Sequence, residues 1–448
     1  MKKLTSILFI LLISFCFVLT GCDGSTLSMP ENFSTPVSNG GFVVGAGNYM
    51  YFANAYKSYS SITSADDNGN NVAQHSFKRL KLQENLDSKG NPIWLKLAKD
   101  ENNSLTYETV ANKILGYETT NLYVVNEYLY FTTPNVHKNN ENNHEFDKST
   151  LFRLKLDGSD LKEILTTKTS TASFYLTKDK TLLIFDDAKI QKINLAQNQT
   201  SVNTLASNVA NVVFPNNEEQ DIAWLYYTSN REDGDLFSGN ILNKVSVKTG
   251  GESIEVYRVA GETINIVAQE NGIIFYTITG GSNAGLYSND FSTSSSRIRH
   301  RTLITGIENS SDLLFIESQD AFVFLYEDKL YIQLLSETNN TQADQLTSEA
   351  TTIYFYNGSY VYYSTSAGIY RYSILQNTHQ QISNHSDIQS GALDFDGRYV
   401  YYFVKGEGQE GETKYLYRAD TYSSDITTEC IAERLESDIP EEDESISK

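Results

Sequence analysis

The chain has 448 residues, of which 56 are acidic and 35 basic, and its formal net charge at pH 7 is −21. An acidic protein is repelled by phosphate backbones and by anionic lipid surfaces, which argues against nucleic acid as a partner. The length allows a sizeable core, either in two domains or in one large repeat domain.

The first residues predict a secretory signal. A pair of lysines precedes an uncharged apolar run from Leu4 to Leu19, which is short for a membrane-spanning helix. The run ends in Leu19-Thr20-Gly21-Cys22, which resembles the bacterial lipoprotein signal, where small residues precede a cysteine that receives lipid before cleavage in front of it. The resemblance implies a signal peptide over residues 1–21 and acyl chains such as palmitate on Cys22. An uncleaved anchor and an ordinary secretory leader are the alternatives.

Lipid on Cys22 predicts a location on the extracytoplasmic face of the cell membrane, since two or more acyl chains anchor a protein durably. In double-membrane bacteria an aspartate in the place of Asp23 is associated with retention at the inner membrane. Residues 22–39 are polar and predict a flexible tether, with order beginning near Gly40. Loss of the leader removes its two lysines and changes the net charge to −23.

The cysteines predict no disulfide framework. Cys16 leaves with the leader and Cys22 carries lipid, so Cys430 has no partner within the chain. Stability must therefore come from burial of apolar side chains.

From residue 40 to residue 430 the same unit recurs: an alternating strand, a Gly- or Asn-rich turn, an aromatic strand, a polar gap and another alternating strand. The two clearest units carry Asn357-Gly358 and Asp396-Gly397 between alternating runs. Such pairs predict a two-residue type I′ hairpin turn with positive φ at both residues. The aromatic strands of eight copies begin at Tyr49, Tyr128, Leu182, Trp224, Ile273, Phe322, Tyr360 and Tyr399.

The spacing of these copies predicts a β-propeller. From the second copy onward they start roughly 38 to 54 residues apart, close to the length of a four-stranded blade. The first gap is longer, which predicts extra strands in the first blade at residues 93–97 and 105–110. We therefore expect an all-β fold with eight blades, or seven if the copy around Ile184 or Phe324 merges with a neighbour. A strand near residues 41–44 is expected to complete the last blade and close the ring.

A family resemblance supports this fold. The second copy, Tyr128–Thr132 followed by Leu151–Lys162, resembles the repeats of a bacterial extracytoplasmic family of unknown function, which is itself similar to the YWTD propellers of low-density-lipoprotein receptors. The chain departs from that pattern, because its Asp-Gly-Ser turn occurs in one copy only among the repeats and the nearest approach to Tyr-Trp-Thr-Asp is Trp224–Thr228. Receptor propellers have six blades, so the resemblance leaves the blade number open.

Candidate metal sites are few. The Asn-rich run that holds His137, His144 and Glu145 offers a metal clasp, with a solvated loop as the simpler interpretation. Residues 66–70 and 232–235 offer clustered oxygens for calcium but lack the spacing of a helix–loop–helix site, so turns are the preferred interpretation. The other histidines lie in polar stretches that we expect to be loops, and they are His75, His300, His379 and His385.

The sequence contains no nucleophile elbow, phosphate loop or dinucleotide fingerprint. We therefore expect no catalytic residue, cofactor or metal ligand. The 30 tyrosines lie mostly in strands, which favours packing between sheets, with the hydroxyl reaching water, over stacking on sugar rings. Residues 431–448 are crowded with Asp and Glu and predict a disordered tail.

These observations favour a membrane-anchored lipoprotein whose propeller is a scaffold for an envelope protein or an extracellular ligand. Two alternatives stay open. One is glycan or solute binding for uptake or sensing, and the other is an enzyme that cleaves polysaccharide or peptide with carboxylates in the channel.

Overall fold

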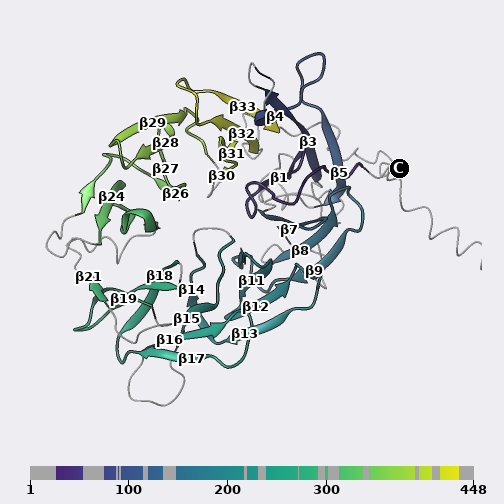
Figure 1. Cartoon of the computed structure of the whole chain (residues 1–448). Coiled ribbons are helices and arrows are strands. Elements are labelled where there is room, and N and C mark those ends of the chain that lie inside the picture. The colour runs from purple at the N-terminus through teal and green to yellow at the C-terminus, as the bar shows by residue number, and fades with distance from the viewer. Residues whose placement is uncertain are drawn as a thin grey trace, which may run out of the picture.

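The chain folds into a ring of eight antiparallel sheets around a central channel (Figure 1). The computed structural model describes residues 27–53, 75–86, 89, 92–114, 120–134, 148–215, 219–230, 239–270, 272–290, 298–300, 312–335, 343–388, 393–405 and 414–432. Each sheet is one continuous stretch of chain and forms one blade. The prediction of an all-β propeller with eight blades is confirmed. The seven-blade alternative is wrong, because the copies around Ile184 and Phe324 each belong to a separate sheet.

The first four blades run from residue 43 to residue 258. Blade 1 consists of β1 (Val43–Ala46), β2 (Tyr49–Ala53), β3 (His75–Leu86), β4 (Pro92–Leu97) and β5 (Tyr107–Ile114). Blade 2 consists of β6 (Thr120–Val125), β7 (Tyr128–Pro134), β8 (Ser149–Lys155) and β9 (Lys162–Thr166). Blade 3 consists of β10 (Ser173–Leu176), β11 (Thr181–Asp186), β12 (Lys189–Asn194) and β13 (Asn203–Ser207). Blade 4 consists of β14 (Val209–Val212), β15 (Trp224–Asn230), β16 (Asn240–Ser246) and β17 (Ile254–Arg258).

The last four blades run from residue 263 to residue 432. Blade 5 consists of β18 (Thr263–Glu270), β19 (Ile273–Thr279), β20 (Gly285–Asn289) and β21 (Ile298–His300). Blade 6 consists of β22 (Leu313–Ile316), the 3₁₀ turn η1 (Glu317–Gln319), β23 (Ala321–Tyr326), β24 (Lys329–Leu334) and β25 (Asp344–Gln345). Blade 7 consists of β26 (Thr352–Tyr356), β27 (Tyr360–Thr365), β28 (Gly368–Ser373) and β29 (Thr378–Ser383). Blade 8 consists of β30 (Asp394–Phe395), β31 (Tyr399–Lys405), β32 (Lys414–Asp420) and β33 (Thr428–Ala432).

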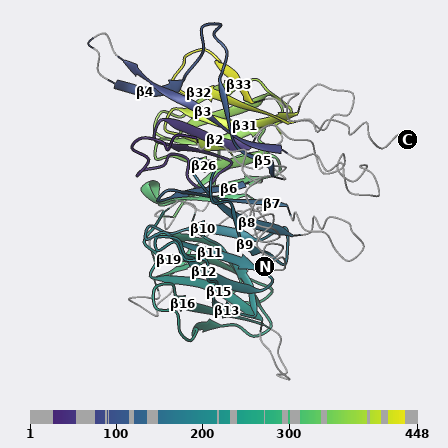
Figure 2. The ribbon, with the colours of Figure 1, turned by 90° about the vertical axis from the view of Figure 1, so that its right-hand side faces the viewer.

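The predicted extra strands of the first blade are confirmed as β4 and β5. The twelve-residue strand β3 pairs with β5 along its first half and with β4 along its second half. Blade 1 therefore extends beyond the ring, where β4 projects at the upper left of Figure 2.

Apolar side chains of neighbouring blades meet in eight buried clusters, one at each blade interface. The second strand of each blade is rich in aliphatic and aromatic residues, and successive side chains point to opposite faces, so each sheet presents large side chains to both neighbours. Fully burying one such side chain contributes about 1.5–3 kcal/mol. The tyrosines that are less than 2% exposed are Tyr51, Tyr130, Tyr226, Tyr276, Tyr362 and Tyr402.

Packing of these tyrosines is as predicted, but the expected contact of their hydroxyls with water is wrong. The Tyr51 hydroxyl donates a 2.7 Å hydrogen bond to the Leu156 carbonyl of the next blade. Burial raises the pKa of Tyr226 to about 12, and it raises the pKa of Tyr130 as well. The hydroxyls lie inside the blade interfaces, because the neighbouring sheet covers the whole tyrosine side chain.

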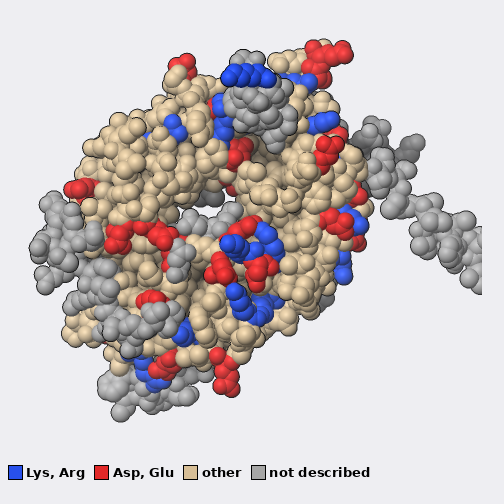
Figure 3. All heavy atoms as spheres, in the orientation of Figure 1, with Lys and Arg blue, Asp and Glu red and all other residues tan. Residues whose placement is uncertain are grey.

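One face of the ring carries the turn that follows the first strand and the turn that follows the third strand of each blade. We call it the turn face. Its turns meet across blade boundaries, as where the Lys178 amide donates to the Gln220 carbonyl. The small green helix η1 at the left of Figure 2 lies on this face, and Figure 3 views the ring from the same side.

The two predicted hairpin turns differ from type I′. Only the glycines Gly358 and Gly397 have positive φ, at 88° and 93°. The side-chain oxygen of Asn357 accepts hydrogen bonds from the amides of Ser359 and Tyr360, and Asp396 makes the same pair of bonds. The side chain of Asn357 or Asp396 thus takes the place of a backbone acceptor, and of the two residues in each predicted turn only the glycine lies in the left-handed region.

The tether prediction is wrong for residues 27–38, which pack on the turn face and which we call the strap. Leu27, Met29 and Phe33 lie against the buried cluster between blades 1 and 2. The ordered chain therefore begins well before Gly40, because burial of these three apolar side chains against the propeller stabilises the segment. At the other end β33 continues to Ala432, and the predicted acidic tail from residue 433 onward lies outside the described residues.

The predicted closing strand is also wrong. Val43 pairs with Phe52 inside blade 1, so β1 belongs to its own blade and not to the last one. Blade 8 needs no added strand, because β33 already supplies its outer edge. The ring closes between blades 8 and 1 without a shared strand, through side chains that contact the side chains and backbone of the other blade.

Candidate functional site

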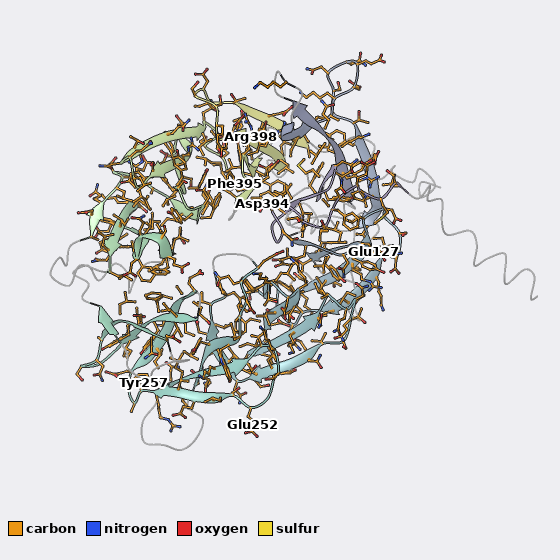
Figure 4. All side chains as sticks on the ribbon, in the orientation of Figure 1. Glu127, Glu252, Tyr257, Asp394, Phe395 and Arg398 are labelled. Carbon is orange, nitrogen blue, oxygen red and sulfur yellow. The ribbon has the colours of Figure 1, made fainter. Side chains whose placement is uncertain are left out.

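The seam between blades 8 and 1 joins residues about 350 positions apart in the chain. The backbone amides of Phe42 and Val43 donate hydrogen bonds to the same carboxylate oxygen of Asp394, at 2.7 and 2.6 Å. Asp394 is only 6% exposed, and Figure 4 places it beside the central channel. The rings of Phe42 and Phe403 pack across the seam with centroids 4.8 Å apart and planes tilted by 40°. The hydrogen bonds of this buried carboxylate therefore join the first and last blades, which share no strand.

Above this seam lies a pocket of about 360 Å³ on the turn face, which we call the closure pocket. Its volume is within the range of small-ligand sites. Three segments line it: the strap, the start of blade 1 and the turn-face end of blade 8. The lining residues are Asn32, Thr35, Val37, Ser38, Val43, Gly45, Gly47, Met50, Leu82, Asp396, Arg398, Tyr399, Tyr401 and Arg418.

One wall of the closure pocket is charged and aromatic. Arg418 forms an ion pair with Glu429 at 2.7 Å, and Arg398 forms one with Asp420. The ring of Tyr399 lies between the two guanidinium groups, 4.2 Å from that of Arg418 and 5.5 Å from that of Arg398. The wall is therefore held rigid by paired charges and cation–π contacts, and its guanidinium groups are neutralised.

Asp396 also lines the closure pocket, and hydrogen bonds hold its two carboxylate oxygens. One oxygen accepts the amides of Arg398 and Tyr399, and the other accepts the Tyr401 hydroxyl at 2.5 Å. Burial, and next the charge of Asp396, raise the pKa of Tyr401 well above its usual value. Tyr401 therefore stays protonated and donates to Asp396.

The opposite wall is aliphatic and depends on a close approach of the strap. Val37, Val43, Met50 and Leu82 supply it. The strap crosses the β1–β2 turn at Gly47, where φ is 57° and a Cβ would lie 1.9 Å from the Glu31 carbonyl oxygen. Only glycine allows both the left-handed backbone and this contact.

The aromatic–arginine contact of the closure pocket recurs around the ring. In five blades a cation on the third strand lies over the aromatic residue that opens the second strand, with distances to the ring centroid of 3.8 to 4.7 Å. The pairs are Arg79 over Tyr49, Arg153 over Tyr128, Lys244 over Trp224, Arg371 over Tyr360 and Arg418 over Tyr399. The recurrence marks a structural element of these five blades, and the sequence signal that was missed is the cation within the third strand of each of them.

Two further hollows lie on the turn face. Between blades 6 and 7 a cleft of about 450 Å³ is lined by aromatic residues of β26 and by η1, and a 2.9 Å hydrogen bond joins Ser318 and Tyr356 there. Between blades 4 and 5 a pocket of about 210 Å³ includes Trp224 and Glu270. Charges of both signs gather beside the central opening in Figure 3. On the turn face Lys180 of blade 3 pairs with Glu219, which precedes β15 of blade 4. The closure pocket differs from both in having one apolar and one charged wall.

Most sequence-predicted site residues fall outside the described residues. These are Cys22, the possible metal clasp at His137, His144 and Glu145, and the calcium candidates at 66–70 and 232–235. In the part of the chain that the structure describes, no three metal-ligating side chains come together and no helix is long and apolar enough to cross a membrane.

The expectation that the other histidines lie in loops is wrong for three of them, since His75, His300 and His379 belong to strands. His385 follows β29 directly, and its ring lies 4.4 Å from that of Tyr417. Its Nδ1 is 2.9 Å from the Tyr402 hydroxyl. Burial lowers the pKa of His385 below its usual value, so the neutral ring is favoured in the folded protein.

This lowered pKa predicts a pH dependence of stability. The unfolded chain binds the proton of His385 near pH 6.5 and the folded chain only at lower pH, so this contribution is present above pH 6.5 and is lost as the pH falls toward the folded pKa. We expect His385→Gln to flatten the fall in unfolding free energy between about pH 7 and pH 5, measured by urea denaturation. A wild-type slope that survives the substitution unchanged would contradict this assignment.

The similarities of this chain to known proteins are weak. No family model and no curated protein matches the chain. An acylaminoacyl peptidase from Pyrococcus horikoshii aligns with 67% of this chain at 14% identity and a TM-score of 0.42, and this chain spans half of its length. The β-propeller domain of the Trilobed protease from Pyrococcus furiosus, which has an open velcro topology, aligns with 87% of this chain and 96% of its own length at 11% identity and a TM-score of 0.36.

Proposed function

We propose that this protein is a secreted lipoprotein, held to the extracytoplasmic face of the membrane by lipid on Cys22, and that its propeller binds an envelope protein or an extracellular ligand through the closure pocket. The leader and the Leu-Thr-Gly-Cys sequence support the location. One observation carries the binding role, namely a pocket of about 360 Å³ with one aliphatic and one charged aromatic wall. Such a combination suits ligands that have an apolar part and a hydrogen-bonding part.

The state of the pocket's acidic groups supports binding over catalysis. Asp396 accepts three hydrogen bonds, and Asp420 and Glu429 are paired with arginines. Burial raises the pKa of Glu429, but the hydrogen bond from Lys99 and the charge of Arg418 outweigh it and hold this pKa below its usual value. Glu429 is therefore an ionised acceptor, whereas a general acid needs a raised pKa and a free proton. All three carboxylates have fixed hydrogen-bond partners.

The pocket suits one anchor residue of a partner better than a large ligand. Its arginines already have acidic partners, so a ligand gains more from contact with Tyr399 and the aliphatic wall than from net charge. Aromatic and aliphatic anchors seated in a central pocket carry much of the energy of protein interfaces. We therefore favour a partner protein with an aromatic or aliphatic side chain at the contact.

A photo-crosslinking experiment on intact cells tests this function. Benzoylphenylalanine at Thr35, an exposed residue of the pocket rim, is expected to capture one discrete partner. The matched control is the same label at Glu252, which is exposed on a distant blade (Figure 4). Equal capture at both positions would rule out the closure pocket as the binding site. Release of a Cys22→Ala form from the membrane fraction is the expected result for the anchor, and its retention there would rule the anchor out.

A further inference from the structure

The strap is bound to the turn face at several points. The Leu27 amide donates to the Asp157 carbonyl in the β8–β9 turn at 3.3 Å, and the Glu31 amide donates to Asn48 in the β1–β2 turn at 3.1 Å. The Nη1 of Arg79, a fully buried residue, donates to the Ser28 carbonyl at 2.8 Å. Leu27, at the start of the strap, is therefore held on the turn face near blades 1 and 2.

The distance from that point to the lipid is short. Leu27 is five residues after Cys22, so the two residues are at most about 18 Å apart, whatever path the chain takes. A blade is thicker than this. The seven residues of β8 alone span about 23 Å from one face of the ring to the other. A chain anchored at Cys22 cannot pass around the rim and bring the opposite face to the bilayer.

An independent observation points to the same face. The described residues include seven large apolar side chains that are at least 41% exposed. All seven lie on the strap, in turn-face turns or at the turn-face ends of strands. They are Val37, Leu161, Ile254, Ile273, Leu375, Tyr422 and Ile426. The most exposed are Leu375 at 81% and Tyr422 at 69%, in the third-to-fourth strand turns of blades 7 and 8.

We infer that the turn face lies against the bilayer surface, with these apolar side chains at the headgroup level. The inference rests on the lipid anchor of the proposed function. Single exposed apolar residues are ordinary, but all seven in the part of the chain that the structure describes lie on one face, as a flat, interfacial seat requires. Tyrosine is suited to such a position because its ring is apolar and its hydroxyl is polar. The acidic charge of the chain opposes attraction to anionic lipid, so the anchor and the apolar contacts hold the face in place.

The orientation has a consequence for the closure pocket. The pocket opens on the turn face, so a ligand reaches it from the gap between the propeller and the membrane. A partner that is itself held in the membrane meets this requirement, whereas a large soluble partner does not fit the gap.

Fluorescence quenching in vesicles tests the orientation. The lipidated protein, with Cys430→Ser to remove its own thiol, carries a bimane on either Lys178→Cys or Lys189→Cys. Both lysines are exposed on blade 3, and they lie at opposite ends of the six-residue strand β11, about 20 Å apart. The protein is bound to phosphatidylcholine vesicles that contain a lipid with a nitroxide-labelled headgroup. We expect loss of fluorescence at residue 178 and little change at residue 189.

The outcomes separate this inference from the proposed function. Protein that fails to float with the vesicles overturns both the lipid anchor and the orientation. Protein that floats but is quenched equally at both labels, or more strongly at residue 189, overturns the orientation alone. In the double variant Leu375→Ser with Tyr422→Ser, we expect the difference between the two labels to shrink. An unchanged difference would show that these side chains do not touch the bilayer.

Discussion

Replacing Asp394 by alanine is expected to lower the free energy of unfolding by about 2 to 5 kcal/mol. The substitution leaves the amides of Phe42 and Val43 buried without their acceptor, and each unsatisfied donor costs about 1–3 kcal/mol. The loss falls at the one interface where no chain connection holds the blades together. Urea denaturation followed by tyrosine and tryptophan fluorescence measures the change.

The matched control is Asp425→Ala in the same blade, because this aspartate is exposed, and its expected change is within about 0.5 kcal/mol. Gly41→Ala is expected to lower the stability of the same seam, because its Cβ would lie 1.8 Å from an Asp394 carboxylate oxygen. If Asp394→Ala and the control unfold at the same urea concentration, water replaces the carboxylate and the seam depends on apolar packing alone.

Replacing Arg79 by alanine is expected to cost about 3 to 5 kcal/mol, the range for breaking a buried charged network. Its guanidinium is fully buried, lies 3.8 Å from the centroid of the Tyr49 ring and pairs with Glu108 at 2.7 Å. It also holds the Ser28 carbonyl of the strap. We therefore expect faster amide hydrogen exchange in residues 27–38 in addition to the lower stability.

Arg258→Ala is the matched control for Arg79, because Arg258 forms an ion pair with Glu255 in which both side chains are more than 40% exposed. Exposed pairs contribute at most about 1 kcal/mol, so little change in stability and none in strap exchange is expected. Strap exchange that stays slow in Arg79→Ala would mean that Leu27, Met29 and Phe33 hold the strap without the arginine.

The blades were predictable because their signal is local. Alternation of aromatic and β-branched residues over five to seven positions, with glycine or asparagine between runs, identifies a strand pair without knowledge of its neighbours. The copies at Leu182 and Phe322 obey the same rule although their strands are short, which is why the blade count was correct. The extra strands between the first and second copies were predictable for the same reason, since residues 93–97 and 105–110 alternate like the other strands.

The closure and the pocket were not predictable, because they depend on contacts between distant residues. Asp394 meets the amides of Phe42 and Val43 only after eight blades have turned the chain through a full circle. The strap was misjudged because its apolar residues are interspersed with polar ones, and only the surface of blades 1 and 2 shows what they cover. The lipid attachment at Cys22 remains a prediction from the leader.

The closure without a shared strand also affects how such a ring can change in evolution. Every blade is encoded by one uninterrupted segment, so duplication or deletion of that segment adds or removes a complete sheet and leaves all the other sheets intact. In a ring that is closed by an exchanged strand, the same event at either terminus would leave a sheet incomplete. In this protein the number of blades is therefore limited by the angle at which neighbouring sheets pack and by the fit of Asp394 to the first blade.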